Sequence, residues 1–369
     1  MRSYIASDLK ELNRSAVYAL LRRQGELSKA EIGRRSGISA PTVMKIVDHF
    51  VDSGIASEAG PLEIALGRRP TRIRFEADSN FSIGAQYDGI HLIVGLVDLA
   101  GRVRGTKKTL APPELGEILS NRLADEVEAL LGEWGGERER VRGIGIGVPG
   151  VVDRESARIR FAPLAGLHES FEYPSFLEGL GERLGFPAFI ENDANAAALG
   201  EHAARSPDRD LDLAFIEMGR GIGAGLILDG RLRSGRRGLA GEVGYLVMER
   251  GWKASAGKAG WFEARMDLAS FWEEVERSGA PRQESLSRIV EHLALAISAI
   301  ALTLDLRLFI IGQAGDRRFG TALLEGLRAA LAEMTAVELV CEAPRAEEPG
   351  MAGAAGLATE AWLKELFAA

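Results

Sequence analysis

Cysteine is nearly absent from this chain of 369 residues, which contains Cys341 alone. A single cysteine excludes an intrachain disulfide and a zinc site built from cysteines, and it is typical of proteins in a reducing compartment. The N-terminal stretch MRSYIASDLKELNRS lacks the apolar core of a signal peptide. The longest apolar run, residues 293–304, falls short of the roughly 20 residues that a membrane-spanning helix needs. We therefore expect a cytoplasmic protein without a membrane partner, in which this run is buried.

The composition otherwise resembles that of a globular protein with two or three domains, with 46% hydrophobic and 27% charged residues. The formal net charge of −8 is unevenly distributed. Residues 1–75 hold 13 Lys and Arg against 8 Asp and Glu, so the rest of the chain is strongly acidic. A basic N-terminal segment on an acidic body indicates that only this segment meets a polyanion.

Residues 1–76 predict three helices followed by two short strands. Apolar side chains at residues 13–23 share one helical face, and Ser28 with Glu31 has the spacing of a capping box that starts a second helix. The third helix begins after Ser39. Its apolar residues follow the spacing of a buried stripe: Val43, Ile46, Val47, Phe50 and Val51. This arrangement is typical of a winged helix-turn-helix.

The third helix and the strand pair carry the candidate DNA contacts. Ser39, Thr42 and Lys45 lie near the start of the helix, where a recognition helix enters the major groove. Arg68 and Arg69 lie between the two strands and predict a basic wing that contacts phosphates or the minor groove. The alternative interpretation is a three-helix packing or dimerisation module; spacing, capping and charge together favour DNA binding.

Residues 77–369 alternate apolar strands with helices and place glycine-rich turns at strand ends. This pattern predicts an α/β fold with ligand sites at those ends. One such junction reads IENDANAAALGE, where a strand turns into an alanine-rich helix. Asn192, Asp193 and Asn195 are each good helix N-caps, so capping alone is the default interpretation of any one of them.

Several stretches together resemble the ROK family (repressors, open reading frames and sugar kinases), specifically its regulator branch. They are LNRSAVYALLRRQGELSKAEIGRRSGISAPTVMKIVDHFVDSG, GIGIGVPGVVD, IENDANAAALGE and GRGIGAGLILDGRLRSGRRGLAGEVGY. The resemblance spans nearly the whole chain. It implies an actin-like, ribonuclease-H-type ATPase fold behind the winged helix-turn-helix, with lobes at 77–190 plus 350–369 and at 191–349. It also implies a sugar and ATP cleft between the lobes, and a homodimer or homotetramer.

The resemblance assigns the candidate sugar-binding residues. In the family's kinases, the residues matching Asn192 and Asp193 bind the sugar and abstract a proton from its hydroxyl. Glu242 and Glu263 match carboxylates that hydrogen-bond sugar hydroxyls, which suits groups that accept charge-assisted bonds in fixed directions. Tyr245 replaces a histidine that touches the sugar, and it either offers a hydroxyl or fills the core.

Departures from the kinase pattern indicate that this chain does not transfer phosphate. The first phosphate loop has lost its acid, threonine and lysine, and it places an anion beside the expected triphosphate, which opposes binding. The aligned residues there are Gln86, Asp88, Gly89, Ile90 and His91, of which only Gly89 matches the kinases. The second phosphate loop carries Arg220 in place of threonine, and residues 312–315 have larger side chains than the kinases' adenosine-side glycines.

The family's zinc site and one sugar contact are also altered. Tyr245, Ala254, Ala256 and Trp261 occupy the four zinc-ligand positions, and none is a plausible ligand. Pro163 stands where relatives often have a sugar-binding asparagine. We therefore predict a site without zinc and without ATP.

These observations predict a sugar-responsive, DNA-binding repressor whose partners are operator DNA and a sugar or sugar derivative. Asp193 would hold the ligand rather than act as a base. The first alternative is an ATP-dependent sugar kinase with a DNA-binding head. The second is a constitutive DNA-binding protein with a vestigial sugar site. Glu242 also has a structural alternative, an ion pair with Arg236 or Arg237.

Overall fold

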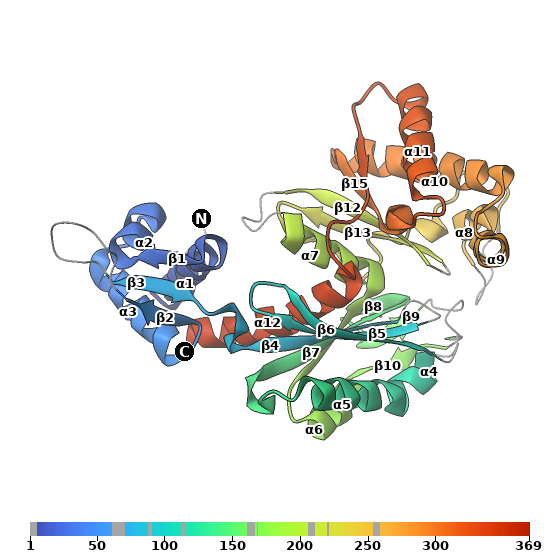
Figure 1. Ribbon diagram of the computed structural model, residues 1–369. Coiled ribbons are helices and arrows are strands. Elements are labelled where there is room, and N and C mark those ends of the chain that lie inside the picture. Colours follow the sequence, from blue (N-terminus) through green and yellow to red (C-terminus); the bar gives the residue numbers. More distant parts are fainter. Residues whose placement is uncertain are drawn as a thin grey trace.

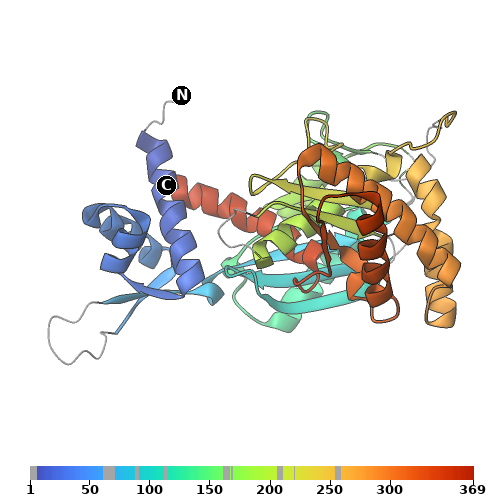
Figure 2. The same ribbon diagram turned by 90° about the horizontal axis from the view of Figure 1, so that it is seen from above.

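The computed structural model describes residues 6–60, 71–87, 91–111, 115–160, 167, 169–205, 211–219, 221–253 and 259–369. A small N-terminal head stands apart from a larger two-lobed body, and the end of the C-terminal helix α12 (Pro349–Ala368) reaches into the head (Figures 1 and 2). Arg68, Arg69, Asp88, Gly89, Ile90, Pro163, Arg220, Ala254 and Ala256 lie outside the described residues.

The head has the predicted winged helix-turn-helix order. Its elements are α1 (Ala6–Gln24), β1 (Glu26–Ser28), α2 (Lys29–Ser36), α3 (Ala40–Asp52), β2 (Ala56–Ala59) and β3 (Arg72–Phe75). The strands form a sheet in the order β1-β3-β2. The capping box of Ser28 and Glu31 is present at the start of α2, and Gly37 ends that helix in the left-handed conformation that glycine tolerates. The four buried residues of α3 all belong to the predicted apolar stripe, but its fifth member, Val51, is 36% exposed because it lies at the edge of the stripe in the last turn.

The N-terminal lobe is built on a mixed sheet in the order β11-β7-β4-β5-β6. Its strands are β4 (Phe81–Tyr87), β5 (His91–Asp98), β6 (Val103–Leu110), β7 (Val141–Val148) and β11 (Ala188–Asn192). Around them lie η1 (Ala77–Ser79), α4 (Leu115–Glu117), the π-helical turn η2 (Ile118–Arg122), α5 (Leu123–Trp134), η3 (Arg138–Arg140) and α6 (Pro174–Leu184). A small sheet contains β8 (Val151–Asp153), β9 (Arg158–Arg160) and β10 (Phe171–Glu172).

The C-terminal lobe repeats the mixed-sheet plan in the order β14-β13-β12-β15-β16. Its strands are β12 (Leu213–Met218), β13 (Ile222–Leu228), β14 (Arg231–Leu232), β15 (Leu308–Ile311) and β16 (Val340–Glu342). The remaining elements are α7 (Asp193–Arg205), η5 (Val243–Tyr245), α8 (Trp261–Met266), α9 (Leu268–Ser278), α10 (Gln283–Leu304), η6 (Gly312–Gly315) and α11 (Gly320–Met334). In each lobe the first two strands pair in antiparallel fashion, β4 with β5 and β12 with β13. A later strand then joins the first one in parallel, β7 beside β4 and β15 beside β12.

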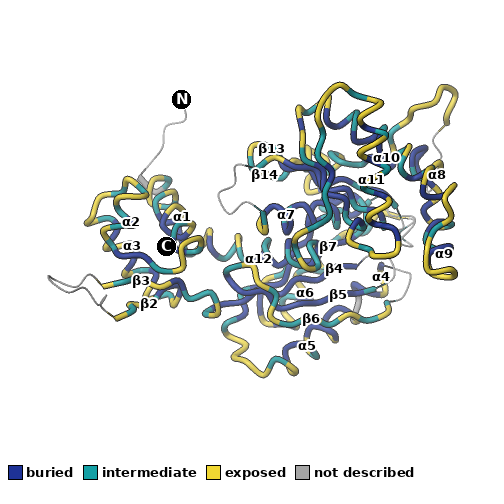
Figure 3. The backbone as a smooth tube through the Cα atoms, turned by 45° about the horizontal axis from the view of Figure 1, so that its top comes forward, coloured by how far each residue is buried: buried dark blue, intermediate teal, exposed yellow. Residues whose placement is uncertain are grey.

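Helices α7 and α12 lie side by side between the two sheets, and α5 and α6 cover the opposite face of the N-terminal sheet (Figure 1). Strand β4 is buried along its whole length because helices cover both faces of its sheet, whereas the edge strand β6 alternates between half-buried and exposed residues (Figure 3). The sequence run 293–304 lies in α10, and its residues up to Ala301 largely pack into the core of the C-terminal lobe, whereas Leu302 is 64% exposed. Among the described helices, α10 alone has the length and apolar character of a membrane span, a test that buried core helices also pass.

Glycines let α12 lie directly on the backbone of its neighbours. A Cβ atom on Gly145 of β7 would overlap the carbonyl of Ala354, and one on Gly84 of β4 would also collide with the α12 backbone. A Cβ atom on Gly353 of α12 would overlap the carbonyl of Ala196 in α7. Real Cβ atoms do not make such contacts. Any residue other than glycine at these three positions would therefore push α12 away from β4, β7 and α7.

The far end of α12 is part of the head. Phe367 packs against Tyr18 and Phe50, with ring centroids 5.7 and 5.9 Å apart. Three side chains of the head bond the last carbonyl groups of the helix: Arg14 to Leu366 and Phe367 (3.1 and 2.9 Å), Lys10 to Ala369 (2.9 Å) and His49 to Leu366 (3.0 Å). Such groups satisfy the unpaired carbonyls and complement the negative end of the helix dipole. The head therefore shares a core with α12.

Candidate functional sites: a DNA-binding face and a carboxylate cluster

The outer face of α3 is the candidate DNA-binding face. Lys45 is exposed on the side opposite the buried stripe. Thr42 is half-buried, and its hydroxyl lies 2.9 Å from the hydroxyl of Ser39. The structure therefore places Lys45 where it can reach a base or phosphate and ties Ser39 to Thr42 at the helix start.

Asn192, and not Asp193, makes the capping bond at the start of α7. The side-chain oxygen of Asn192 accepts a hydrogen bond from the backbone N–H of Asn195 at 3.0 Å, which is the bond an N-cap makes. The Asn192 amide also donates to the carbonyl of Gly150 (3.0 Å) and to Asp193 Oδ1 (2.9 Å). Asp193 Oδ1 also accepts a bond from the backbone N–H of Ala194 at 2.8 Å, so both residues satisfy N–H groups of the first turn, and Asn192 makes the standard capping bond.

Glu191, which the sequence patterns did not single out, holds this junction in place. Its carboxylate is 2% exposed and accepts bonds from Arg154 (2.5 Å), from the Asn195 amide (3.1 Å) and from the backbone N–H of Asn192 (2.9 Å). The one sequence feature that could have indicated its role is its position directly before Asn192.

Asp193, Glu242 and Glu263, which we call the carboxylate cluster, gather around the first residues of β13. The residue after Asp193, Ala194, packs on the glycines of β13, and Gly241, just before Glu242, bonds to β13 through Ala224. Glu263 accepts a bond from the β13 N–H of Ile222 at 3.3 Å. Three carboxylates from separate segments therefore meet at one strand end.

Two close approaches shape the cluster. A Cβ atom on Gly244 would lie 2.7 Å from Glu263 Cγ, and one on Gly260 would lie 2.7 Å from the carbonyl carbon of Gly244. Because glycine has no Cβ atom, the segments that carry Gly244, Gly260 and Glu263 can approach this closely. Glu263 also accepts a bond from the N–H of Gly260 at 3.2 Å.

Burial and mutual repulsion raise the pKa values of carboxyl groups in the cluster. Burial, together with the charges of Asp193 and Glu263, raises the pKa of Glu242 to about 8. Burial also raises the pKa of Glu263. The hydrogen bonds from the N–H groups of Gly260 and Ile222 act in the opposite direction and lower it. With a pKa of about 8, the Glu242 carboxyl is protonated at neutral pH and can donate a hydrogen bond as well as accept one.

The ion pair considered for Glu242 is not formed with Arg236. Arg236 instead bonds Glu155 at 2.9 Å, on an exposed surface. In the part of the chain that the structure describes, no ion pair of Glu242 is found, because its closest charged neighbours are the other two carboxylates.

Tyr245 belongs to the surroundings of the cluster and is not a core residue. Its side chain is 37% exposed. Burial of its hydroxyl and the charges of Glu263 and Glu242 raise the pKa of Tyr245 to about 12, so this hydroxyl stays protonated and can donate to a ligand.

The raised pKa of Glu242 predicts a pH-dependent stability. In the folded chain this carboxyl keeps its proton up to about pH 8, whereas in the unfolded chain it ionises near pH 4.5. Its contribution to stability is thus complete below pH 4.5 and is lost as the pH rises through about 8. We expect Glu242→Gln to raise the melting temperature more at pH 8 than at pH 5, as measured by calorimetry without ligand. An equal effect at both pH values would contradict the assignment.

Side chains at the positions that match the nucleotide side of the family's kinases bond to or pack on other residues of this chain. Gln86 is 7% exposed, and its amide fills the space above Gly350 at the start of α12. Gln313 of η6 donates to Glu217 at 2.7 Å and accepts from the N–H of Met218 at 2.9 Å. Trp272 donates to the carbonyl of Gly219 at 2.9 Å, at the edge of the second glycine loop.

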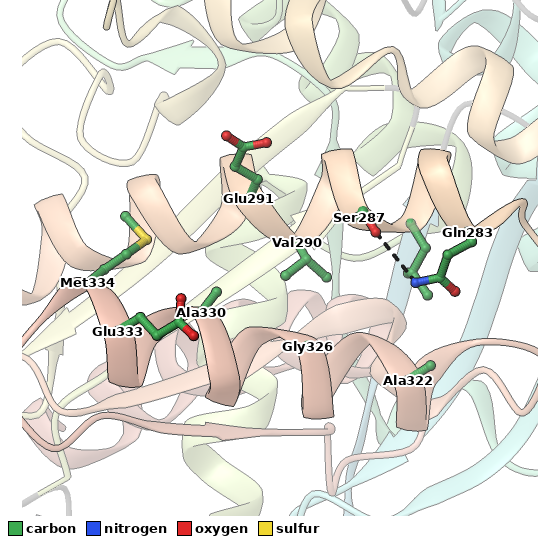
Figure 4. A pocket seen from close by; sticks show the side chains of 10 residues that line it. Gln283, Ser287, Val290, Glu291, Ala322, Gly326, Ala330, Glu333 and Met334 are labelled. Atoms are coloured by element: carbon green, nitrogen blue, oxygen red, sulfur yellow. Dashed lines mark hydrogen bonds between the residues drawn. The ribbon is translucent and has the colours of Figure 1, made fainter.

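A groove of about 390 Å³ between α10 and α11 is separate from the carboxylate cluster (Figure 4). The two helices approach closely there, since a Cβ atom on Gly326 would lie 2.9 Å from Val290. The groove contains none of the candidate ligand-binding residues, so it does not compete with the cluster as the sugar site.

Comparisons with known proteins identify two families along the chain. Residues 12–56 match a winged helix-turn-helix DNA-binding family, and residues 83–265 match the ROK family. Behind its winged helix-turn-helix, the chain carries a ROK family domain. The ROK domain includes the strand pair β4–β5, Asn192 and the carboxylate cluster.

Two curated relatives of this chain are transcriptional regulators. The DNA-binding transcriptional dual regulator NagC of Escherichia coli K12 is 27% identical over 241 residues, which are 65% of this chain and 58% of NagC. The xylose repressor of Caldicellulosiruptor bescii is 30% identical over 245 residues, 65% of this chain and 59% of the repressor. The match thus spans less than two thirds of either relative.

Solved structures confirm the predicted fold. A ROK family transcriptional regulator homologous to the E. coli MLC protein matches 97% of this chain and 98% of its own, with a TM-score of 0.76 at 21% identity. The ROK hexokinase of Thermus thermophilus matches 77% of this chain and 99% of its own, with a TM-score of 0.57 at 27% identity. Only the first of these two matches extends over the head as well as the body.

Proposed function

We propose that this protein is a sugar-responsive transcriptional repressor of carbohydrate metabolism genes. The head binds operator DNA through α3 and the basic wing, and the carboxylate cluster holds a sugar or a sugar derivative. The observation that carries the proposal is the meeting of Asp193, Glu242 and Glu263 at one end of β13, where the charges of Asp193 and Glu263 help to raise the pKa of Glu242. Carboxyl groups gathered in this way can bond several hydroxyl groups of one ligand in fixed directions. The regulators NagC and xylose repressor, each of which matches 65% of this chain, support the same class of function.

The sugar acts on DNA binding through α7 and α12. Helix α7 begins at Asp193, and Gly353 of α12 packs against its backbone. The end of α12 carries the head through Phe367. A ligand that draws Asp193 and Glu242 together shifts α7, and with it the angle at which α12 holds the head. The sites are coupled only if the two head positions differ in their affinity for the sugar.

Two copies of the chain bind one operator in this proposal. A homodimer, or a homotetramer of two such pairs, places two recognition helices in successive major grooves of a pseudo-palindromic site. Neither zinc nor Mg-ATP takes part. Trp261 stands at one of the family's zinc-ligand positions. It is 6% exposed and donates its indole N–H to Glu249 at 3.1 Å, so its role here is to pack in the core.

An operator-release assay across a sugar panel tests this function. The panel contains hexoses, pentoses, N-acetylhexosamines and their 6-phosphates, and release of a labelled operator duplex is followed by fluorescence anisotropy. We expect one sugar class to change operator affinity by about fivefold or more, the usual size of an allosteric coupling. Operator binding that no sugar alters would instead indicate a vestigial sugar site.

The rival function is an ATP-dependent sugar kinase with a DNA-binding head. The specific observation in its favour is the intact Asp193, in a domain that resembles a ROK hexokinase. Steady consumption of ATP with any sugar of the panel, abolished by Asp193→Ala, would replace our proposal. We expect no turnover above the rate of that variant.

A further inference from the structure

The outward surface of α3 has a charged flank and an apolar flank. Lys45 lies opposite the buried stripe of Val43 and Phe50. Met44 lies about 100° further round the helix, where its side chain is 53% exposed. Val51 shares that flank and is 36% exposed. A large apolar side chain on the recognition helix thus faces solvent in the free protein.

Ion pairs locate this flank relative to strand β2. Asp48, one turn after Met44, lies 3.6 Å from Lys29, and Lys29 also pairs with Glu58 of β2 at 3.1 Å. The flank that carries Met44 and Asp48 therefore lies on the side of α3 that is linked to β2 through Lys29.

The opposite flank of α3 faces the body. His49 bonds the carbonyl of Leu366 in α12, and Thr42, which lies on the same flank, bonds Ser39. Among the described residues of α3, the side chains that point away from both the core and α12 are thus those near Lys45, Asp48 and Met44. Asp48 repels phosphates and is engaged with Lys29.

We propose that Met44 is a specificity-determining residue of the head and reads the methyl group of a thymine in the major groove. A thioether side chain has no donor with which to bind a base edge, and its flexible chain adapts to apolar surfaces. The 5-methyl group of thymine is the apolar feature of the major groove, and it distinguishes thymine from every other base. The inference rests on the proposed DNA binding of the head.

The test compares thymine with uracil in the same duplex. The full-length chain first selects its operator from a random duplex pool. Each thymine of that operator is then replaced by deoxyuridine, which removes the methyl group and nothing else. We expect one position per half-site to weaken wild-type binding about fourfold, because burying one methyl-sized group contributes about 0.8 kcal/mol.

Met44→Ala should weaken binding to the thymine duplex by at least that factor and be insensitive to uracil at that position. Met334→Ala is the matched control: it shortens an exposed methionine of the body, 43% exposed, and should leave every duplex unaffected. Lys45→Ala should weaken binding and keep the full thymine-to-uracil difference.

Other outcomes separate the failure of this inference from that of the proposed function. If no duplex is selected, DNA binding itself is wrong. If duplexes are bound but Met44→Ala and uracil act additively at every position, Met44 does not read a methyl group. A Met44→Ala variant that weakens all duplexes equally and loses its self-association would make Met44 a protein–protein contact and would overturn the inference.

Discussion

Gly353→Ala is expected to destabilise the protein by about 3 kcal/mol, the upper part of the range for overpacking a core. The new Cβ atom would overlap the Ala196 carbonyl and come within 2.6 Å of the backbone nitrogen of Gly200. Both obstacles are backbone atoms of α7, so no side chain can rotate away. The strain must displace α12 from α7, and the displacement reaches the head because Phe367 is part of the head's core.

Gly356→Ala is the matched control in the same helix. A Cβ atom at Gly356 meets nothing within 4 Å. Alanine there should stabilise the chain by about 0.5–1 kcal/mol, since glycine loses more backbone entropy on folding than alanine.

Denaturant unfolding of the two variants and the wild type measures both effects. Gly353→Ala should also shift operator affinity and sugar response together, whereas Gly356→Ala should leave both unchanged. Two variants with equal stabilities would show that α12 is not held on α7 as the structure indicates.

Asp193→Asn is expected to lower sugar affinity about tenfold to a hundredfold, because a hydrogen bond to a charged group contributes about 1.5–3 kcal/mol. The amide keeps an oxygen that can accept from the Ala194 N–H, which Asp193 Oδ1 now does at 2.8 Å. The variant should therefore fold. Removing one charge should also lower the pKa of Glu242, which Asp193 now helps to raise.

Calorimetric titration with the active sugar measures this prediction. Glu155→Gln is the control, since it removes a nearby carboxylate that bonds Arg236 and does not belong to the cluster. Wild-type sugar affinity in Asp193→Asn, or an equal loss in Glu155→Gln, would show that Asp193 does not contact the ligand.

The head was largely predictable from sequence because its signals are local. The capping box of Ser28 and Glu31 and the apolar stripe of α3 each depend on residues within a few positions, and both are present. The side of α3 that faces DNA was less accessible. It depends on where β2 and α12 lie, which Lys29 and His49 reveal only through contacts distant in sequence.

The carboxylate cluster was predicted only through family resemblance. Nothing in the local pattern brings Asp193, Glu242 and Glu263 together, since they come from three segments that meet on β13. Spacing also could not decide which residue of ENDAN caps α7. Asn192 and Asp193 are equally good caps in sequence, and the bond from the Asn195 N–H decides for Asn192.

The junction between α12 and the head was not predicted. The sequence indicates a helix near residue 350, but Arg14 and the carbonyl of Phe367 that it bonds lie 353 positions apart. A basic side chain in the first helix looks like a contributor to DNA binding until its acceptor is seen. Arg14 is only 8% exposed and stabilises the end of α12.

The most direct test of the account is reciprocal linkage between the two sites. The affinity of the active sugar is measured by calorimetry for the free protein and for the protein saturated with operator duplex. In this account, one equilibrium between two positions of α7, α12 and the head couples the sugar site to the DNA-binding face. Operator must then weaken sugar binding by the same factor by which sugar weakens operator binding. Equal sugar affinities with and without operator would contradict the account.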